Sequence, residues 1–550
     1  MSPLLRVLCA SAAGVLAASA AGADVSLEVK LATGGQAPGS APGRTLGYVN
    51  TPVINDAGEL AFVGHVYDPS LDSWGMEIFG PDAAGQPTSI ASTFDPAPDL
   101  PPDTDFNFDL THSPRLDDAG TVVFDARLSG PGIDYPENSS GIWRWKAENG
   151  LERLARAGDP VPQAGPDAVY GPIGGGHALG SGGVVAFPSS VVDPSDPVGR
   201  VGLFTLDGAQ TSMLIVEGSP APGLPGVTLG SVGVADANDH GSWSFSTALA
   251  GPGIVPLQND SASFTWDPEG GVAMHLRGGD PAPGTPPGVV LSSWYGAPVG
   301  LNAAGDIARL ASLTGPGVDD TNDTALYGPS SSGALSLIAR EGSAAPDTEA
   351  STVFDSLLNA SHCTVINAGG QVAFFANLLG PSVTPENMGG LWRHDAATDT
   401  VELLVRQGDP APELPGLSLA DLSCPVLNDR GDVVYYATLA GPGVTPETDR
   451  AIFALEGAVV PRKVVREGDL VAFGPGDLRP LVSLWLPNGT GSAVPGAAPL
   501  SHNGHLAFHS YTPDGTHAIL VATIPEPGFT SGLAAGLVLL ATLARSRSRR

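Results

Sequence analysis

Short apolar stretches, separated by turns rich in Gly and Pro, recur along almost the whole chain. Eight of them follow a glycine at a fixed distance. An apolar residue stands two positions after it and, in all but one copy, an aromatic residue stands four positions after it. Side chains alternate between the faces of a strand, so these positions share one face. A recurring unit of this length predicts a repeat architecture. The repeat glycines are Gly58, Gly120, Gly183, Gly241, Gly305, Gly370, Gly431 and Gly504, spaced 58 to 73 residues apart.

The remainder of each repeat predicts further short strands. The position three after the repeat glycine is small at Ala61, Ala186 and Ala373, so the second face of the strand is covered as well. Proline stands eleven positions after the glycine in seven copies and ends the strand. Shorter apolar segments, such as Leu391-Trp392, complete the repeat. Four short antiparallel strands per repeat are the content of one propeller blade.

The two ends of the repeat region predict how the fold closes. The last repeat runs through residues 517–524 and lacks its third strand, whereas the segment 25–35 carries a matching strand and turn. An N-terminal strand in the last blade would close a ring and remove the sheet edges. We therefore expect an all-β repeat fold over residues 24–523, an eight-bladed β-propeller closed by the N-terminal strand. An open β-repeat stack is the alternative, because it would show the same local pattern.

The first residues of the chain predict export. Arg6 precedes an apolar run, which is followed by Ala21-Gly22-Ala23 and then Asp24. This is the pattern of a secretory signal peptide over residues 1–23, cleaved between Ala23 and Asp24. The apolar run is shorter than the roughly 20 residues of a membrane span.

Residues 524–550 predict a second addressing segment. Pro525, Glu526 and Pro527 precede an apolar stretch over 529–544 and four terminal arginines. This order resembles the PEP-CTERM sorting signal of bacterial exported proteins, in which a membrane-embedded exosortase recognises Pro-Glu-Pro and removes the tail. The resemblance implies an exosortase-type partner and transient anchoring in the inner membrane through a C-terminal helix. The body would then lie in the cell envelope or outside the cell. A plain C-terminal membrane anchor is the alternative.

Five repeats carry an asparagine three positions before the repeat glycine. Asparagine bonds to nearby backbone groups and tolerates left-handed conformations, so we expect a structural role in a turn. A ring of ligand-binding amides is the second hypothesis. The pairs are Asn55 and Gly58, Asn238 and Gly241, Asn302 and Gly305, Asn367 and Gly370, and Asn428 and Gly431.

The full signature is Asn-x-x-Gly-x-x-Ala-Phe, as in residues 55–62. Together with the sorting tail, it resembles the choice-of-anchor tandem-repeat surface proteins over roughly residues 45–515. The chain departs from the pattern where Asp117, Gly180 and Ser501 replace the asparagine and Arg309 replaces the phenylalanine. The resemblance implies a surface-displayed body and no catalytic residues.

The charge of the chain narrows the range of partners. The net charge is −32 and there is no basic patch, which excludes nucleic acid. A strong negative charge suits an exported protein that stays soluble by self-repulsion. The C-terminal segment is the only part expected to meet a membrane, and extracellular polysaccharide is a candidate partner.

Two of the three cysteines occupy equivalent positions. Cys363 and Cys424 each lie four residues before the repeat asparagine, in consecutive repeats. Exported proteins can keep disulfides, which suggests a bridge between them. A disulfide requires Cα atoms within about 7 Å, closer than neighbouring inner strands usually lie. The sequence leaves this bridge open.

No cofactor is expected, and the sequence does not decide whether a metal binds. His502, His505 and His509 cluster in the last repeat, but on one strand His505 and His509 would lie about 13 Å apart, too far for one ion. Acidic turns offer oxygen ligands suited to calcium, although without the spacing of a helix-loop-helix site. These turns are Asp103-x-Asp105-x-Asn107, Asp117-Asp118 and Asp319-Asp320-x-Asn322-Asp323.

Catalytic motifs are missing from the sequence. There is no Gly-x-Ser-x-Gly elbow, no His-Glu-x-x-His and no phosphate-binding glycine loop, so no catalytic residue is assigned. We expect a non-enzymatic binding or structural scaffold at the cell surface or in an extracellular matrix. The alternative is a secreted propeller hydrolase or lyase acting on polysaccharide. Such an enzyme would gather its repeat-breaking residues at one mouth of the channel.

Overall fold

The computed structural model describes residues 25–50, 52–108, 114–174, 176–207, 210–233, 238, 241–292, 300–357, 363–457, 460–486 and 499–526. The predicted signal peptide with its predicted Ala23–Asp24 cleavage site, Pro527 and the apolar C-terminal stretch lie outside these ranges. Among the described residues, no helix has the length and apolar character needed to cross a membrane.

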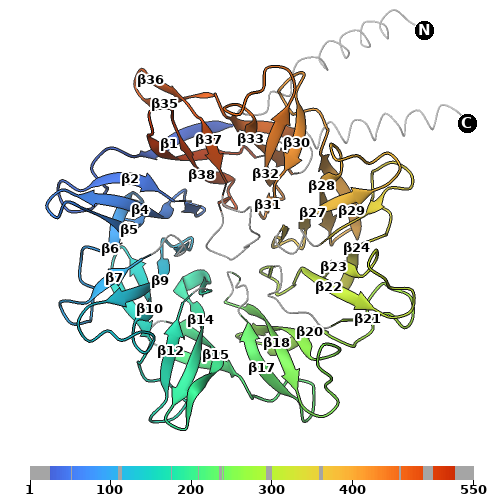
Figure 1. Cartoon of the computed structure of the whole chain (residues 1–550), viewed down its shortest axis with the longest axis horizontal. Coiled ribbons are helices and arrows are strands. Elements are labelled where there is room, and N and C mark those ends of the chain that lie inside the picture. The colour runs from blue at the N-terminus through green and yellow to red at the C-terminus, as the bar shows by residue number, and fades with distance from the viewer. Residues whose placement is uncertain are drawn as a thin grey trace, which may run out of the picture.

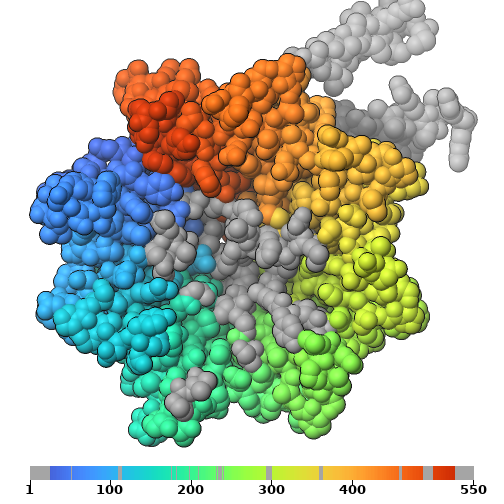
Figure 2. Space-filling model, viewed as in Figure 1, coloured from blue at the N-terminus to red at the C-terminus, as the bar shows by residue number. Residues whose placement is uncertain are grey.

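Eight antiparallel sheets of four or five strands follow one another around a ring (Figure 1). The space-filling view shows each blade in contact with its neighbours (Figure 2). The chain is an all-β propeller with eight blades, which confirms the predicted fold class. The repeat glycines fall one to a blade.

The strands of the first four blades are as follows. Blade one contains β2 (Thr45–Val49), β3 (Val53–Ile54), β4 (Leu60–Asp68), β5 (Ser73–Pro81) and β6 (Pro87–Ser92). Blade two contains β7 (Asp105–Asn107), β8 (Arg115–Leu116), β9 (Val122–Ser129), β10 (Ser140–Lys146) and β11 (Gly150–Arg156). Blade three contains β12 (Val169–Ile173), β13 (Ala178–Leu179), the 3-10 turn η1 (Ser181–Gly183), β14 (Val185–Asp193), β15 (Asp196–Asp207) and β16 (Gln210–Val216). Blade four contains β17 (Thr228–Gly233), β18 (Trp243–Ala250), β19 (Ser261–Asp267) and β20 (Gly271–Arg277).

The strands of the other four blades complete the ring. Blade five contains β21 (Val290–Leu291), β22 (Arg309–Thr314), β23 (Thr324–Pro329) and β24 (Leu335–Arg340). Blade six contains β25 (Val353–Phe354), β26 (Thr364–Ile366), β27 (Val372–Leu379), β28 (Gly389–Asp395) and β29 (Thr400–Arg406). Blade seven contains β30 (Ser418–Leu422), β31 (Val426–Leu427), β32 (Val433–Ala440), β33 (Arg450–Glu456) and β34 (Val460–Arg466). Blade eight contains β1 (Ser26–Ala32), β37 (Ser483–Trp485), β38 (His505–Tyr511) and β39 (His517–Thr523).

The N-terminal strand closes the ring as predicted. Blade eight has the strand order β1-β39-β38-β37, and Leu27 of β1 lies opposite Ala522 of β39. A further hairpin, β35 (Leu470–Gly474) and β36 (Asp477–Pro480), stands beside this blade and was not predicted. Because the first strand β1 and the last strand β39 share one sheet, blade eight is a complete four-stranded sheet.

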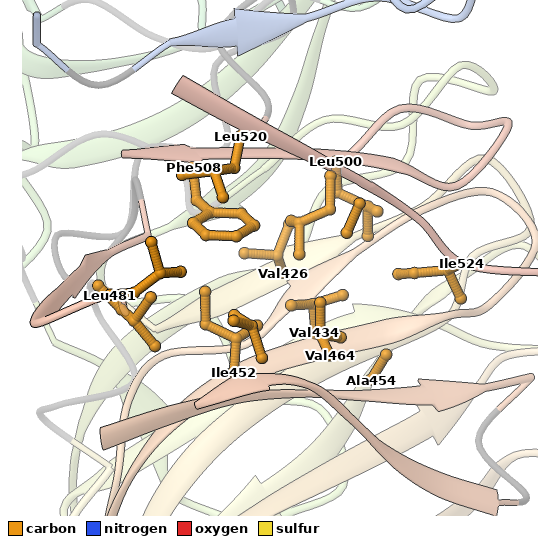
Figure 3. Close-up of a cluster of buried hydrophobic side chains, with 14 of the residues drawn as sticks. Val426, Val434, Ile452, Ala454, Val464, Leu481, Leu500, Phe508, Leu520 and Ile524 are labelled. Atoms are coloured by element: carbon orange, nitrogen blue, oxygen red, sulfur yellow. The ribbon is translucent and has the colours of Figure 1, made fainter. Parts of the chain in front are cut away.

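Apolar residues of adjacent blades form the core. Figure 3 shows Phe508 and Leu520 of blade eight facing Ile452 and Val434 of blade seven. Within blade one, the ring of Phe62, four positions after its repeat glycine, stacks on Phe79 of the next strand at 4.8 Å. Each large side chain buried in this way stabilises the fold by about 2 kcal/mol. The apolar contacts between adjacent blades therefore hold the repeats together around the ring.

Candidate functional site

The repeat glycines are required by the backbone of the Asn-x-x-Gly turns. In all eight blades the φ angle of this glycine lies between 75° and 84°, the left-handed region that a residue with a Cβ atom rarely adopts. Within the turn, the asparagine Oδ1 accepts the N–H of the residue four positions on, as for Asn367 and Gln371 at 2.9 Å. The five repeat asparagines are 2–4% exposed.

The same asparagines bond from one blade to the next. The Nδ2 of Asn55 donates to the carbonyl oxygen of Asp117 at 3.0 Å. Equivalent bonds join Asn238 to Asn302 (2.7 Å), Asn367 to Asn428 (3.0 Å) and Asn428 to Ser501 (3.2 Å). The amide of Asn302 donates to the carboxylate of Asp306 in its own turn, at 3.1 Å, and Asn55, Asn367 and Asn428 make the same kind of bond in theirs.

The blade-eight turn links back to blade one. The backbone N–H of Asn503 donates to Asp56 Oδ1 at 3.0 Å, and its side-chain amide donates to the Asp56 carbonyl at 3.1 Å. The repeat asparagines are thus buried and engaged with backbone groups. This arrangement leaves little of their hydrogen-bonding capacity for a ligand.

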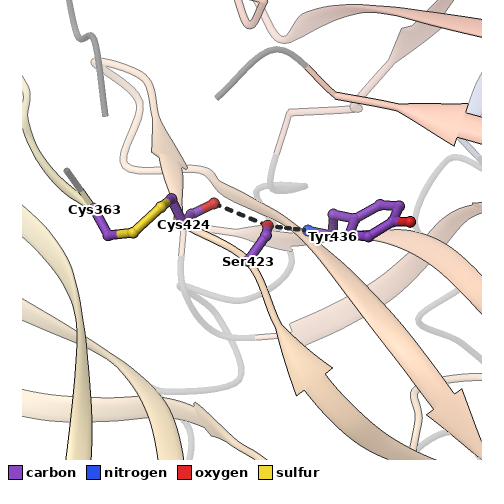
Figure 4. Close-up of a disulfide and its surroundings, with 4 residues drawn as sticks. All are labelled: Cys363, Ser423, Cys424 and Tyr436. Atoms are coloured by element: carbon purple, nitrogen blue, oxygen red, sulfur yellow. Dashed lines mark hydrogen bonds between the residues drawn. A yellow bond between two sulfur atoms is a disulfide. The ribbon is translucent and has the colours of Figure 1, made fainter. Parts of the chain in front are cut away.

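Cys363 and Cys424 form a disulfide between blades six and seven (Figure 4). Their Cα atoms are 4.5 Å apart, closer than the sequence analysis expected of neighbouring inner strands. Neither cysteine lies on a strand: Cys363 directly precedes β26, and Cys424 lies two residues before β31. Figure 1 labels β31 near the centre of the ring. Blades converge there, which brings equivalent positions together.

The three histidines of blade eight have separate partners. His502 Nδ1 lies 2.9 Å from a carboxylate oxygen of Asp429, and His505 Nδ1 lies 3.3 Å from Thr523 Oγ1. His509 Nε2 lies 2.9 Å from His517 Nδ1. Burial and the neighbouring His517 lower the pKa of His509 to about 4. In the described part of the chain, no group of three or more His, Cys, Asp or Glu side chains is placed to hold a metal ion.

Two of the three acidic turns accept hydrogen bonds from their own or neighbouring backbone, whereas Asp105–Asn107 of the third forms strand β7. Asp117 Oδ1 accepts the N–H groups of Ala119 and Thr121, and Asp118 Oδ1 accepts that of Asp56 in blade one. Asp319 Oδ1 likewise accepts the Thr321 N–H at 3.0 Å. These contacts are typical of Asx turns.

Arg309, which breaks the aromatic pattern in blade five, is fully enclosed. Its side chain is 2% exposed, and one of its terminal nitrogens donates to Ser246 Oγ of blade four at 2.8 Å. Burial lowers the pKa of Arg309 to about 9. The residue therefore links two blades.

A cavity of about 360 Å³ opens between blades two and three. We call it the blade 2–3 cavity. Its polar lining residues are Asp125, Arg127, Tyr135, Ser139 and Ser140. Strand β9 positions two of them, because Asp125 and Arg127 are two residues apart and share its face.

One residue that lines the cavity, Asp125, contacts a buried histidine. His177 Nδ1 is 3.2 Å from Asp125 Oδ1, and both side chains are at most 6% exposed. Ser140 Oγ accepts the backbone N–H of Ile173 at 2.8 Å, which ties the two blades together beside the cavity. The Tyr135 ring stands at its edge and is 79% exposed. The arrangement offers fixed hydrogen-bonding groups beside one exposed aromatic ring.

A family profile described as "Family of unknown function (DUF7453)" matches residues 10–346 and again residues 329–531. The chain belongs to this family. No curated protein matches the DUF7453 chain.

Solved propeller structures resemble this DUF7453 protein distantly. The Dos1 propeller is 9% identical with a TM-score of 0.35, over 88% of this chain and 94% of the other. The polysaccharide lyase Uly1 is 8% identical with a TM-score of 0.29, over 89% of both chains. The Pyrococcus horikoshii acylaminoacyl peptidase is 10% identical with a TM-score of 0.33, over 76% of this chain and 52% of the other. Likenesses of this size support no functional inference.

The DUF7453 sequence contains a signal for the blade 2–3 cavity that the sequence analysis did not use. Five positions after the repeat glycine, blade two alone has a carboxylate, Asp125. Seven positions after it, blade two alone has an arginine or lysine, Arg127. Two such departures on one strand face could have indicated a site.

Proposed function

We propose that this protein is an exported, non-enzymatic scaffold that is displayed at the cell surface or released into an extracellular matrix. There it binds components such as extracellular polysaccharide. The observation that carries the proposal is the series of Asn-x-x-Gly turns. The polar groups repeated around the ring bond to backbone of their own and the next blade, as Asn55 and Asn428 do, so their role is to hold the ring together.

Closure of the ring and the disulfide support this role. Strand β1 pairs with β39 and so covers the edge of the last strand, which suits a surface protein at high local concentration. The Cys363–Cys424 disulfide is suited to an oxidising compartment outside the cytoplasm. The net charge of −32 opposes self-association.

The sorting motif begins where the propeller ends. The Ile524 N–H donates to the Gly504 carbonyl at 2.8 Å, and Arg430 donates to the Ile524 carbonyl at 3.1 Å. Ile524 is therefore fixed to the ring, while Glu526 two residues later is exposed. An exposed Glu526 directly after a folded body suits recognition of the predicted motif by a membrane-embedded enzyme.

Expression of the full-length chain in a bacterium that has an exosortase tests the proposal. We expect the protein to be accessible to protease on intact cells and to lose its C-terminal tail. The double variant Pro525→Ala, Glu526→Ala should keep the tail and stay with the membrane fraction. The matched control is Pro513→Ala, which alters a proline of the β38–β39 turn outside the motif. A chain that stays in the cytoplasm would overturn the proposal.

A further inference from the structure

We propose that the blade 2–3 cavity binds an uncharged sugar residue of a polysaccharide. This inference deepens the proposed scaffold function and rests on it. The cavity lies where the apolar contact between the two blades ends: Val123 and Ile142 pack against blade three, and the next residues on the same strand faces are Asp125, Arg127 and Ser140. Its volume of about 360 Å³ falls in the range of small-molecule sites.

Three residues that line this cavity differ from those at the same positions of the other repeats. Where blade two has Asp125, the other blades have Val63, Pro188, Ser246, Leu310, Phe375, Tyr436 and His509. Where it has Arg127, they have His65, Ser190, Ala248, Ser312, Asn377, Thr438 and Tyr511. Tyr135 stands where blades four, six and seven have Pro256, Pro385 and Pro446. The first two positions vary from blade to blade, so folding of the repeat requires no particular residue there, and Tyr135 replaces a proline that three other blades share.

The chemistry of the lining suits a sugar. The Asp125 carboxylate is an acceptor for hydroxyl groups, and the Arg127 guanidinium is a donor to hydroxyl and ring oxygens. Ser140 Oγ already accepts the Ile173 N–H, so its own proton can be donated to a ligand. The exposed Tyr135 ring offers an apolar face to the C–H groups of a pyranose.

The acceptor Asp125 is held by a buried neighbour. Asp125 contacts the buried His177 at 3.2 Å, which limits the directions its carboxylate can take. Arg127 is exposed and, within the described ranges, no carboxylate forms an ion pair with it. A positioned acceptor beside an available donor matches two neighbouring hydroxyl groups of one sugar ring.

The charge around the cavity favours a neutral ligand over an acidic one. The loop that carries Tyr135 also carries Asp134 and Glu137, and Asp125 lines the cavity. These three carboxylates outnumber Arg127 and Arg156, whose Nε donates to the carbonyl of Asn138 in the same loop at 2.8 Å. The whole chain carries −32. A polyanion would be repelled both locally and at long range.

Isothermal titration of the protein, purified from cells expressing the full-length chain, tests the assignment. Neutral glucan, mannan and xylan oligosaccharides are compared with oligosaccharides of alginate and polygalacturonate. At least one neutral series should bind, and more tightly than either polyuronate. Arg127→Ala and Tyr135→Ala should each weaken binding about tenfold or more. The matched control is Arg200→Ala in blade three, an exposed arginine beside Asp196, which should bind as the unaltered protein does.

Each contrary result would overturn a different part of the proposal. Binding that neither cavity variant weakens would overturn the site but leave a polysaccharide-binding scaffold. Tighter binding of a polyuronate would overturn the neutral ligand. If a surface-displayed protein bound no oligosaccharide, the site would be overturned while a structural scaffold remained. Because Arg127 and Tyr135 are exposed, we expect both variants to fold, and an unchanged melting temperature checks this.

Discussion

The side-chain amide of Asn367 donates a hydrogen bond to the backbone carbonyl of Asn428, the equivalent residue of the next blade, at 3.0 Å. The same bond, with the same direction, recurs between Asn55 and Asp117 at 3.0 Å. One residue type thus performs two tasks. Its oxygen shapes the turn within a blade, and its nitrogen fixes the distance to the following blade. This explains why the asparagine and the glycine recur together.

Replacing Asn367 should destabilise the ring. Asn367→Ala removes one of the two hydrogen bonds that the Asn428 carbonyl accepts, and it leaves the Gln371 N–H without the Oδ1 that accepts it at 2.9 Å. The expected loss in the free energy of unfolding is about 2 kcal/mol or more. Urea denaturation measures it. Asn107→Ala, at an exposed strand end, is the control and should change stability by less than about 0.5 kcal/mol. Equal effects at both sites would contradict the account.

The Cys363–Cys424 disulfide should be intact in the exported protein. Alkylation of the unfolded, non-reduced mature chain is expected to label no thiol, as read by mass spectrometry. The bridge spans 61 residues, and closing a loop of that length stabilises a fold by about 4 kcal/mol. The double variant Cys363→Ser, Cys424→Ser should therefore unfold at a clearly lower urea concentration. Two labelled thiols would show that the bridge is absent.

Protonation of His509 should weaken the fold in acid. Its pKa is about 4 in the folded chain because of burial and His517, against about 6.5 when unfolded. The unfolded state takes up the proton first. Stability from the neutral imidazole is therefore complete above about pH 6.5 and is lost as the pH falls toward 4, with a total of about 3 kcal/mol.

The His509→Phe variant isolates this effect. Burial raises the pKa of Glu341 and of Glu467 to about 7, which gives stability below about pH 4.5 that is lost as the pH rises through 7, in the opposite direction. Both proteins contain these glutamates, so their contributions cancel in the difference in unfolding free energy between the unaltered protein and the variant. Relative to the variant, the unaltered protein should become less stable as the pH falls from 6.5 to 4. A difference that is independent of pH would refute the assignment.

The first strand should be essential to the last blade. Leu27 and Val29 pack against the apolar core of blade eight, whereas Ser26 faces solvent on the same strand. The double variant Leu27→Asp, Val29→Asp should lower the urea midpoint and speed hydrogen exchange in β39. The control Ser26→Asp should do neither. Unchanged protection of β39 would mean that the ring is closed in another way.

Most of the architecture could be predicted because it rests on local chemistry that repeats. The left-handed turn requires glycine at Gly58 and its equivalents, and alternation places Leu60 and Phe62 on one face. The last repeat lacks its third strand in the sequence, and this gap predicted that β1 would join blade eight. The β35–β36 hairpin was not predicted because it occurs only once among the described strands. No second copy distinguished its Gly474-Pro475-Gly476 turn from the turns that end other strands.

Contacts between blades were harder to predict. The proximity of Cys363 and Cys424 depends on how closely blades converge near the centre, which a strand pattern does not determine. The blade 2–3 cavity depends on where the packing of two blades stops, as at Asp125 and Ile173. Both features are distances between repeats, whereas the sequence pattern describes positions within one repeat.

Incubation of the purified protein with extracellular polysaccharides, followed by mass spectrometry of any released oligosaccharides, tests the central claim most directly. A scaffold should retain polymer in co-sedimentation and release no new reducing or unsaturated ends. Release of shortened products that depends on an intact protein would contradict the account and identify a polysaccharide-degrading enzyme.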